Sequence, residues 1–376
     1  MMRFSTLMRH PADWMTGEAA DNSAVLTSRI RLARNLSGEP FPGWAPKERR
    51  CRILARLWPV VEALPVMKDG FSQELSGLDA VQKQVLVERH LISRELAARG
   101  EGSAVVIDRR QTFSLLLNEE DHLRMQAIRP GLALREAFET LSGIDDRLEG
   151  ELEFAFDPDF GYLTTCPTNL GTGLRASVML HLPGLVLADQ TGQVLKAVGK
   201  IGLAVRGLYG EGTDSLGNLF QISNQSTLGE SEETILRRLE RVIGQLAEHE
   251  RNARAKLLED EPNMVRDRIG RAYGTLRHAW MIETKEALRQ LSLLRLGGDL
   301  GLLPPDTMAR CDGLLLDIQP AHLQFLAGRQ LAPEERDTLR AQVIRSRLQS
   351  LAAPVTGVPD DGAGNPPGDD DQPRPA

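Results

Sequence analysis

The hydrophobic pattern of this chain changes near residue 227, and that change limits the folds available to it. Beyond this point nearly every segment has the spacing of an amphipathic helix. The first of these helices has one apolar stripe, made of Ile235, Leu239, Val242 and Leu246. We expect it to start at Thr227, because Glu230 completes a capping-box pattern three residues later, and to close the preceding domain.

The part of the chain before residue 227 mixes strand and helix patterns. Strands are expected at residues 104–107, 112–117, 152–156, 161–165 and 219–223, and helices at residues 47–64, 79–98, 132–141 and 173–181. Strands and helices in this mixed order favour an α+β fold built on an antiparallel sheet. Helical patterns return at residues 254–296, 304–316 and 333–351, which predicts a second, helical domain.

The chain therefore divides into four parts. We expect an N-terminal extension at residues 1–22, the α+β domain at residues 23–253, the helical domain at residues 254–351 and a tail at residues 352–376. The tail is rich in Pro, Gly and Asp and has almost no large apolar side chain. Ordering it would cost more free energy than burial returns, so we expect it to be disordered.

Composition excludes several classes of function. The net charge of -7 argues against nucleic acid as the main partner, because a polyanion requires a basic surface. No run approaches the roughly 20 apolar residues that span a bilayer, so no membrane segment is expected. The three cysteines are far apart and lack the paired spacings of zinc sites or disulfide frameworks. We therefore expect a protein of the reducing cytoplasm without a structural metal.

Arginines cluster at a few places in the sequence, although the net charge of the chain is negative. Three lie within six residues, and three others stand beside glycine or acidic residues: Arg29, Arg31 and Arg34, then Arg124, Arg175 and Arg206. A guanidinium group makes bidentate hydrogen bonds to phosphate and keeps its charge at neutral pH. This distribution favours a small anion such as a nucleotide as the ligand.

One glycine-containing segment has the pattern of a phosphate-binding loop. Residues 166–173 read Cys-Pro-Thr-Asn-Leu-Gly-Thr-Gly, and Leu-Arg-Ala-Ser-Val-Met follows. We interpret this as a strand end, a rigid proline turn, a glycine loop and then a helix with Arg175 in its first turn. The backbone of such a loop can approach a phosphate closely. Alone, the pattern fits an ordinary tight turn better.

Two further segments join charged residues to predicted loops. Residues 118–124 read Asn-Glu-Glu-Asp-His-Leu-Arg directly after a predicted strand, and residues 206–212 read Arg-Gly-Leu-Tyr-Gly-Glu-Gly. Because side chains alternate along a strand, at least one of the three consecutive carboxylates can face a cleft. Each segment taken alone is typical of a solvated surface loop.

Taken together with Ser-Arg-Ile-Arg-Leu-Ala-Arg-Asn at residues 28–35, these segments resemble the ATP:guanido phosphotransferases, or phosphagen kinases, over about residues 24–250. The resemblance implies a glutamine-synthetase-like catalytic domain, an antiparallel sheet flanked by helices. It also implies ATP and Mg²⁺ as cofactors. Within the family the chain resembles the bacterial protein-arginine kinases, because its extra domain follows the catalytic domain. Residues 336–341, Arg-Asp-Thr-Leu-Arg-Ala, match the phosphoarginine-binding motif of that branch.

The resemblance implies the roles of individual residues. Glu120 and Glu211 would grip the guanidinium group, with Cys166 orienting it; we favour Glu211 as the principal base, and the division of roles stays open. The implied ATP contacts are Thr27, Ser28, Arg29, Ile30, Arg31, His90, Arg124, Arg175, Ala176, Ser177, Val178, Met179, Arg206, Gly207, Leu208, Tyr209, Gly210 and Glu211. The implied phosphoarginine contacts are Arg336, Asp337, Arg340 and Ala341, and no protein ligand to a metal is implied.

The implied activity is transfer of the γ-phosphate of MgATP to arginine side chains of proteins, which marks them for a Clp-type protease. Expected partners are proteins with exposed arginines, a Clp protease or unfoldase, an activator protein and a second copy of the chain. Two alternatives stay open. A kinase of free arginine or another small guanidine would share every active-site segment, although small-molecule members carry a leading domain. A non-catalytic phosphoarginine adaptor would have no reason to keep Glu120, Glu211 and Cys166.

Overall fold

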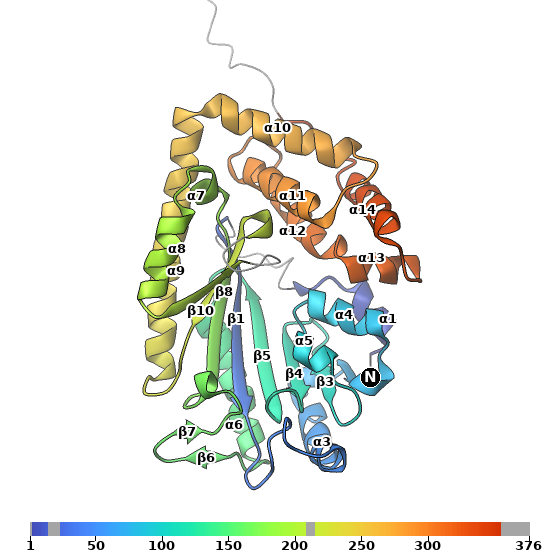
Figure 1. Cartoon of the computed structure of the whole chain (residues 1–376), viewed down its shortest axis with the longest axis vertical. Helices are drawn as coiled ribbons and strands as arrows, with labels where there is room; N and C mark the ends of the chain where they lie inside the picture. Colours follow the sequence, from blue (N-terminus) through green and yellow to red (C-terminus); the bar gives the residue numbers. More distant parts are fainter. Residues whose placement is uncertain (1, 14–22, 208–214, 355–376) are drawn as a thin grey trace, which may run out of the picture.

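The computed structural model describes residues 2–13, 23–207 and 215–354. One large antiparallel sheet forms its centre, in the order β2-β3-β4-β5-β1-β8-β10-β9 (Figure 1). Its strands are β1 (Val25–Arg34), β2 (Phe71–Glu74), β3 (Ala104–Ile107), β4 (Phe113–Leu117), β5 (Leu123–Pro130), β8 (Leu174–His181), β9 (Leu203–Gly207) and β10 (Leu219–Asn224). A separate hairpin pairs β6 (Phe156–Asp157) with β7 (Gly161–Tyr162). The expected α+β fold with an antiparallel sheet is confirmed.

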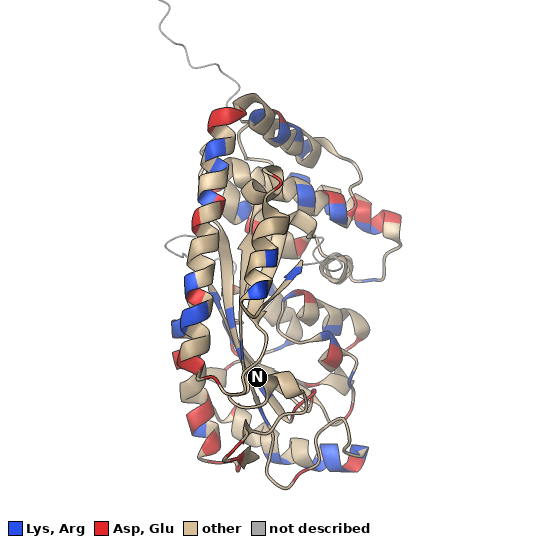
Figure 2. Cartoon of the chain, turned by 60° about the vertical axis from the view of Figure 1, so that its left-hand side comes forward, with Lys and Arg blue, Asp and Glu red and all other residues tan. Residues whose placement is uncertain are grey.

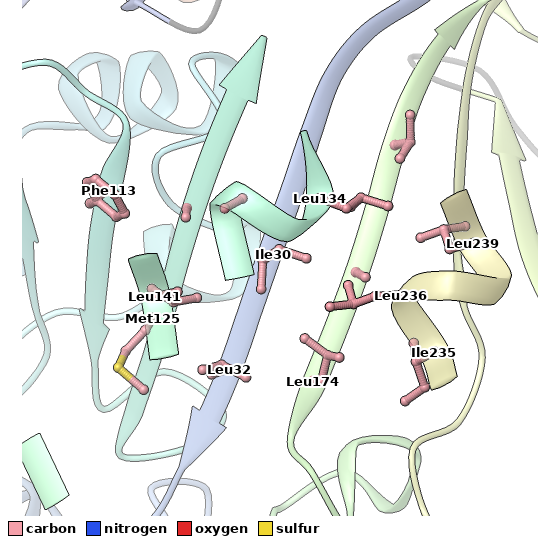
Figure 3. Packing of buried hydrophobic residues seen from close by; sticks show 14 of the residues in the cluster. Ile30, Leu32, Phe113, Met125, Leu134, Leu141, Leu174, Ile235, Leu236 and Leu239 are labelled. Carbon is pink, nitrogen blue, oxygen red and sulfur yellow. The ribbon is translucent and has the colours of Figure 1, made fainter. Parts of the chain in front are cut away.

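Two helices, α6 (Leu134–Glu149) and α9 (Glu232–Asp260), cover one face of the sheet. Figure 3 shows their apolar side chains lying against Ile30, Leu32 and Leu174 of β1 and β8. The predicted stripe of α9 is part of this core, since all four of its members are buried. Burial of each such side chain contributes about 1.5–3 kcal/mol, so this layer fixes which face of each strand is apolar.

The remaining helices of the first domain lie around the sheet (Figure 1). They are α1 (Phe4–Arg9), α3 (Lys47–Glu62), α4 (Ala80–Glu88), α5 (Arg94–Ala97), α7 (Pro183–Leu187) and α8 (Thr191–Lys200). The prediction of a single helix at residues 79–98 is wrong, because helix α4 ends at Glu88. There His90 adopts a left-handed backbone conformation, with φ of 58°, which a continuous right-handed helix cannot contain.

The helix expected at residues 173–181 is also wrong, since this segment is strand β8. Gly171 and Gly173 have positive φ values of 105° and 68°, so the chain turns sharply before the strand begins. From Leu174 the apolar residues then alternate with period two, and β8 pairs with β1 on one side and β10 on the other. Arg175 therefore lies on a strand and not in the first turn of a helix.

Two local boundaries differ from expectation. Helix α9 is capped by Ser231, whose side chain accepts a hydrogen bond from the Thr234 N–H. Thr227 is not the cap, because its hydroxyl donates to the Leu170 carbonyl at 2.6 Å. The strands expected at residues 152–156 and 161–165 are present only as the short strands β6 and β7. The chain turns tightly between them, because the Asp157 carboxylate accepts hydrogen bonds from the N–H groups of residues 159 and 160.

The C-terminal helices form a second hydrophobic core. They are α10 (Pro262–His278), α11 (Thr284–Asp299), α12 (Thr307–Asp317), α13 (Pro320–Ala327) and α14 (Pro333–Arg347). Helix α9 runs without a break through the expected boundary at residue 253, and its outer surface carries charges of both signs (Figure 2). Within the described ranges, no helix combines the length and the apolar character needed to cross a membrane.

Two buried arginines, Arg254 and Arg295, join the two cores. Arg254 of α9 binds Glu250 at 2.6 Å and Asp299 at 2.5 Å, and Arg295 of α11 binds Asp312 at 2.7 Å. Both arginines also donate to the main-chain carbonyl of Ser23, just before β1. Removal of one partner would leave a buried charge uncompensated, which costs about 3–5 kcal/mol. The C-terminal helices are therefore anchored to the start of β1.

Candidate active site

The face of the sheet opposite α6 and α9 carries a group of arginines. Directly paired residues of antiparallel strands point to the same face, and side chains alternate along each strand. Arg31 pairs with Arg175 of β8 and with Gln126 of β5, and Arg206 pairs with Gln221 of β10. The register therefore places five side chains on one face, which we call the arginine face: Arg29, Arg31, Arg124, Arg175 and Arg206.

Burial and mutual repulsion act on these cations. Burial, followed by the charges of Arg124 and Arg175, lowers the pKa of Arg29 to about 10. The pKa of Arg31 is also lowered by burial and by its arginine neighbours, and burial and Arg206 lower that of Arg175. Within the described residues, the buried Nε atoms of Arg31 and Arg175 have no hydrogen-bond partner. An anion with several phosphate groups would satisfy these donors and offset the repulsion.

Arg124 is held in place by a buried carboxylate. The Glu119 side chain is fully buried and accepts a hydrogen bond from Arg124 Nη1 at 2.6 Å. Burial alone would lower the pKa of Arg124, but the contact with Glu119 outweighs it and raises that pKa. Ser93, at the start of α5, donates a second hydrogen bond to Glu119. Glu119 therefore fixes the position of one cation of the arginine face.

A small pocket lies beside the arginine face. Its lining residues are Thr27, Arg29, His90, Ile128, Ser177, Met179 and Gln221. Burial and the charge of Arg29 lower the pKa of His90 to about 3, so its imidazole is neutral near pH 7. Gln126 donates to the His90 carbonyl at 2.7 Å and so holds the left-handed turn in place. The structure thus brings His90, which is distant in sequence, next to Arg29.

Not every expected ATP contact lies on this face. The side chains of Ile30, Ala176 and Val178 alternate onto the opposite face and are fully buried in the apolar core. Ser28 is also buried; its hydroxyl donates to the Gly131 carbonyl at 2.8 Å and accepts from the Ala133 N–H at 3.0 Å. These four side chains do not reach the arginine face.

The ATP contacts expected at residues 207–211 begin at the last residue of strand β9. Gly207 is its last residue and pairs with Phe220. Leu208, Tyr209, Gly210 and Glu211 lie outside the described residues. The expected role of Glu211 as the principal base stays a prediction.

The two loops that carry Glu120 and Cys166 meet at one end of the sheet. Strands β5 and β8 lie on either side of β1 and both run antiparallel to it, so the loops that precede them lie at the same edge. Asp121 accepts hydrogen bonds from Asn35 Nδ2 and from the Thr165 N–H, each at 2.7 Å. The Thr165 hydroxyl donates to the Glu120 carbonyl at 2.8 Å. The main chain next to Cys166 is therefore bonded directly to the Glu120 loop.

The three consecutive acids have different environments. Glu119 and Asp121 are buried and serve as hydrogen-bond acceptors within the fold, whereas Glu120 is only partly buried. Burial, and then the negative charge of Asp121, raise the pKa of Glu120. A raised pKa makes this carboxylate a stronger proton acceptor when it is ionised. Cys166 is also partly exposed, and its Sγ lies 3.1 Å from Thr168 Oγ1.

Sequence reasoning missed the residues that hold this site together. Glu119, Asp121, Asn35 and Thr165 make the contacts that place Arg124, Glu120 and the chain next to Cys166. The run of three acids contained a signal, because alternation cannot expose all three. It could not show which of them are buried, since that depends on contacts with β1 and with residue 165.

The motif at residues 336–341 lies on α14. Arg340 is buried, and its guanidinium donates to the carbonyls of Ile318 and Ile282 at 3.0 and 2.9 Å and to Asp337. Arg336 is partly exposed and donates to the Leu331 carbonyl at 3.1 Å. Arg340 therefore joins α14 to neighbouring helices in this structure. The expected phosphoarginine contacts, including that of Ala341, stay predictions.

The chemistry of the described residues does not favour a metal held by protein ligands. No group of three or more His, Cys, Asp or Glu side chains that could hold a metal ion occurs in the ranges that the structure describes. Glu119 and Asp121 are already engaged by Arg124, Ser93, Asn35 and the main chain. A divalent cation at this site would depend on phosphate oxygens for much of its coordination, as Mg²⁺ often does.

Comparisons with known proteins agree with this geometry. A family model described as "ATP:guanido phosphotransferase, C-terminal catalytic domain" matches residues 60–253, and one described as "Protein-arginine kinase McsB C-terminal domain" matches residues 262–357. The chain is similar to a protein-arginine kinase of Halothermothrix orenii, with 46% identity over 89% of this chain and 96% of the relative. A protein-arginine kinase of Moorella thermoacetica is 47% identical, over 89% of this chain and 97% of the relative.

Solved structures show the same fold. A duplicated taurocyamine kinase from Schistosoma mansoni, with bound transition-state-analogue components, aligns with a TM-score of 0.54 and 27% identity. The match covers 64% of this chain and 36% of that duplicated chain. A lombricine kinase aligns with a TM-score of 0.55 at 24% identity, over 66% of this chain and 71% of the other, and shows likeness of fold alone.

Proposed function

This chain belongs to the ATP:guanido phosphotransferase family, in its protein-arginine kinase branch, and we propose that it transfers the γ-phosphate of MgATP to arginine side chains of other proteins. The observation that carries the proposal is the arginine face, which meets the Glu120 and Cys166 loops at one end of the sheet. A cationic surface beside a carboxylate of raised pKa suits transfer of a phosphoryl group to a protonated guanidine.

On the donor side, the arginines would bind and orient the phosphate groups. Phosphoryl transfer passes through a loose transition state, so positive charge on the phosphate oxygens matters more than covalent chemistry. Arg124 is fixed by Glu119, and the Nε atoms of Arg31 and Arg175, which have no hydrogen-bond partner among the described residues, are buried donors suited to phosphate oxygens. When bound, Mg²⁺ would neutralise part of the phosphate charge. The pocket that contains neutral His90 lies beside this surface and is lined in part by residues of β1, β5 and β8.

On the acceptor side, Glu120 would orient the arginine and remove its proton. A guanidinium has a pKa above about 12 and is not nucleophilic while it is protonated. A carboxylate that accepts hydrogen bonds from it can align one nitrogen with the γ-phosphorus and take up the proton as the N–P bond forms. The burial that raises the pKa of Glu120 supports this role. We propose Cys166 as an orienting group and Glu211 as the second carboxylate.

One assay separates this proposal from its alternatives. The purified chain is incubated with MgATP and a 20-residue peptide that contains one arginine, the same peptide with lysine in that place, or free arginine. We expect acid-labile phosphate on the arginine peptide and none on the lysine peptide. Faster labelling of free arginine would favour a small-guanidine kinase, and absence of label with all three would contradict the proposal.

Partners and location form a further part of the proposal. Family membership supports delivery of the modified proteins to a Clp-type protease or unfoldase, action as a homodimer, and an activator protein. The cysteines at positions 51, 166 and 311 are free, which supports a reducing cytoplasm. Light scattering of the purified chain tests the dimer, and pull-down of phosphorylated substrate with a Clp ATPase tests the delivery.

A further inference from the structure

The β6–β7 hairpin exposes two aromatic side chains close to the proposed site. Phe156 and Phe160 have 59% and 51% of their surface exposed, although phenylalanine is normally among the more buried residues. Both lie on a hairpin that projects at one end of the large sheet, beside α6 (Figure 1). Two large apolar groups on one short hairpin form the kind of surface that partners bind.

This hairpin is bonded to the loop that carries Cys166. The Tyr162 N–H donates to the Gly171 carbonyl at 2.8 Å, and the Gly171 N–H donates to the Tyr162 carbonyl at 3.4 Å. Gly171 belongs to the loop between Cys166 and β8. Tyr162 lies four positions before Cys166 in the sequence, which is at most about 13 Å of extended chain. The hairpin with the exposed aromatic groups is therefore close, along the chain, to the loop of the proposed acceptor site.

Contacts of Tyr162 anchor the hairpin to the rest of the domain. The Arg34 guanidinium stacks 3.5 Å above the Tyr162 ring, and Arg34 also binds Asp145 and the Thr172 carbonyl. Tyr162 in turn packs edge-on against Phe156, with ring centroids 5.3 Å apart. The Phe156 side chain is therefore already packed against an anchored ring, so it loses little conformational entropy when it binds a partner.

The surroundings of the aromatic pair are acidic. Residues 148–174 contain no Lys or Arg, and they include five carboxylates, Glu149, Glu151, Glu153, Asp157 and Asp159. In the part of the chain that the structure describes, none of the five takes part in a salt bridge. Asp157 is used in the turn, whereas Glu151, Glu153 and Asp159 are exposed. This charge suits a basic partner, and the aromatic rings suit apolar and arginine side chains.

We propose that the β6–β7 hairpin binds the unfolded polypeptide on either side of the target arginine, and that it favours segments with apolar and basic residues. The inference rests on the proposed function, because it assigns a surface to the polypeptide that carries the reacting arginine. Apolar residues that are exposed mark unfolded chains, so this surface would distinguish them from folded proteins. It would contribute to the KM for protein and not to the KM for ATP.

The test uses three 20-residue peptides with one central arginine. One has Leu and Lys around the arginine, the second has Ser in place of each Leu, and the third has Glu in place of each Lys. Initial rates are measured for the wild-type chain and for the double variant Phe156→Ser, Phe160→Ser. Leu326→Ser, which removes an apolar side chain with 65% exposure from α13, is the matched control.

We expect the wild type to have the lowest KM for the first peptide. The double variant should raise that KM roughly tenfold and leave the KM for ATP and the saturating rate within about twofold, and it should lose the preference for Leu over Ser. Leu326→Ser should match the wild type. An unchanged KM for the first peptide in the double variant would overturn the inference, and so would equal KM values for the three peptides in the wild type.

A binding measurement keeps this result separate from the proposed function. Fluorescence anisotropy of the labelled first peptide gives Kd without any phosphoryl transfer. Absence of phosphorylation with a Kd that rises roughly tenfold in the double variant would reject the kinase proposal and retain the docking surface. Normal phosphorylation with equal Kd values would reject the docking surface alone.

Discussion

Asp121 accepts the main-chain N–H of Thr165 at 2.7 Å and so joins the loop that precedes β5 to the loop that precedes β8. The same carboxylate oxygen also accepts Asn35 Nδ2, at the end of β1. Three neighbouring strands of the sheet are thereby held together at the edge where Glu120 and Cys166 lie. This carboxylate places the proposed acceptor site without touching a substrate.

Replacement of Asp121 by Ala should reduce kcat by about 10–100-fold, because Glu120 and Cys166 lose their common support. The KM for ATP should change little, since the arginine face is intact. Asp121→Asn retains one acceptor oxygen and should recover most of the rate. Steady-state kinetics with the arginine peptide provides the measurement. A loss of thermal stability in Asp121→Ala without any loss of kcat would show that the contact is structural only.

Glu119→Gln should raise the KM for ATP by roughly tenfold, since Arg124 would lose a buried carboxylate partner whose charged hydrogen bond is worth about 1.5–3 kcal/mol. Glu95→Gln, on the exposed surface of the neighbouring helix α5, serves as the control and should leave the KM unchanged. Nucleotide affinity measured by calorimetry checks both variants. Equal affinities for ATP in the two variants would contradict the assigned role of Glu119.

Gly173→Ala should destabilise the protein by several kcal/mol, because φ is 68° there and an added Cβ would lie 2.6 Å from the Ala33 carbonyl oxygen of β1. Gly192→Ala in α8 is the matched control, since nothing lies within 4 Å of the added atom. Its stability should be unchanged or slightly higher. Urea unfolding of both variants provides the test, and equal midpoints would argue against the close approach of this loop to β1.

Stability should fall between pH 6.5 and pH 5. Burial lowers the pKa of His90 to about 3 and that of His181 well below its usual value, so both stay neutral in the folded state. The unfolded chain takes up a proton on each as the pH drops below about 6.5, which costs about 1.4 kcal/mol per pH unit for each histidine. His249→Gln, at an exposed position of α9, should keep this slope.

His181→Gln should make this slope shallower, because it removes one of the three histidines whose pKa burial lowers, His90, His122 and His181. His181 Nε2 lies 2.7 Å from Ser292 Oγ of α11, so the substitution also tests the link between β8 and the C-terminal helices. Unfolding free energies from urea titrations at pH 7.0, 6.0 and 5.0 give the slopes. A wild-type stability that does not vary across this range would contradict the neutral state of these histidines.

The sequence predicts the fold class well but misplaces elements where local patterns compete. The glycine-loop pattern predicts a helix over Arg175 to Met179, yet the apolar residues from Leu174 to Leu180 alternate with polar or partly exposed residues, which is the period of a strand. The glycines before Leu174 have the pattern of a phosphate loop that opens a helix, and this pattern competes with the alternation. The long stripe of α9, by contrast, has a single strong period and was predicted correctly.

The sequence identifies the segments that form the site, but it does not show how they are arranged in space. Resemblance indicated the arginines, but which of them share a face depends on the register of β1 with β5 and β8, which no local pattern specifies. The register also shows that the side chains of Ile30, Ala176 and Val178 belong to the core. Contacts such as that of Asp121 with Thr165 join residues 44 positions apart, and they become visible only in the folded chain.

The most direct measurement compares wild type with Glu120→Gln at saturating MgATP and arginine peptide, with the phosphorylated residue located by mass spectrometry. Gln has the shape of Glu but cannot take up the guanidinium proton, so kcat should fall by at least about 100-fold. The Kd for ATP should stay within about threefold, and Glu139→Gln on the exposed surface of α6 should behave as wild type. Phosphate found on the arginine in wild type and lost in Glu120→Gln would support the account. An undiminished rate in Glu120→Gln, or phosphate on a residue other than arginine, would contradict it.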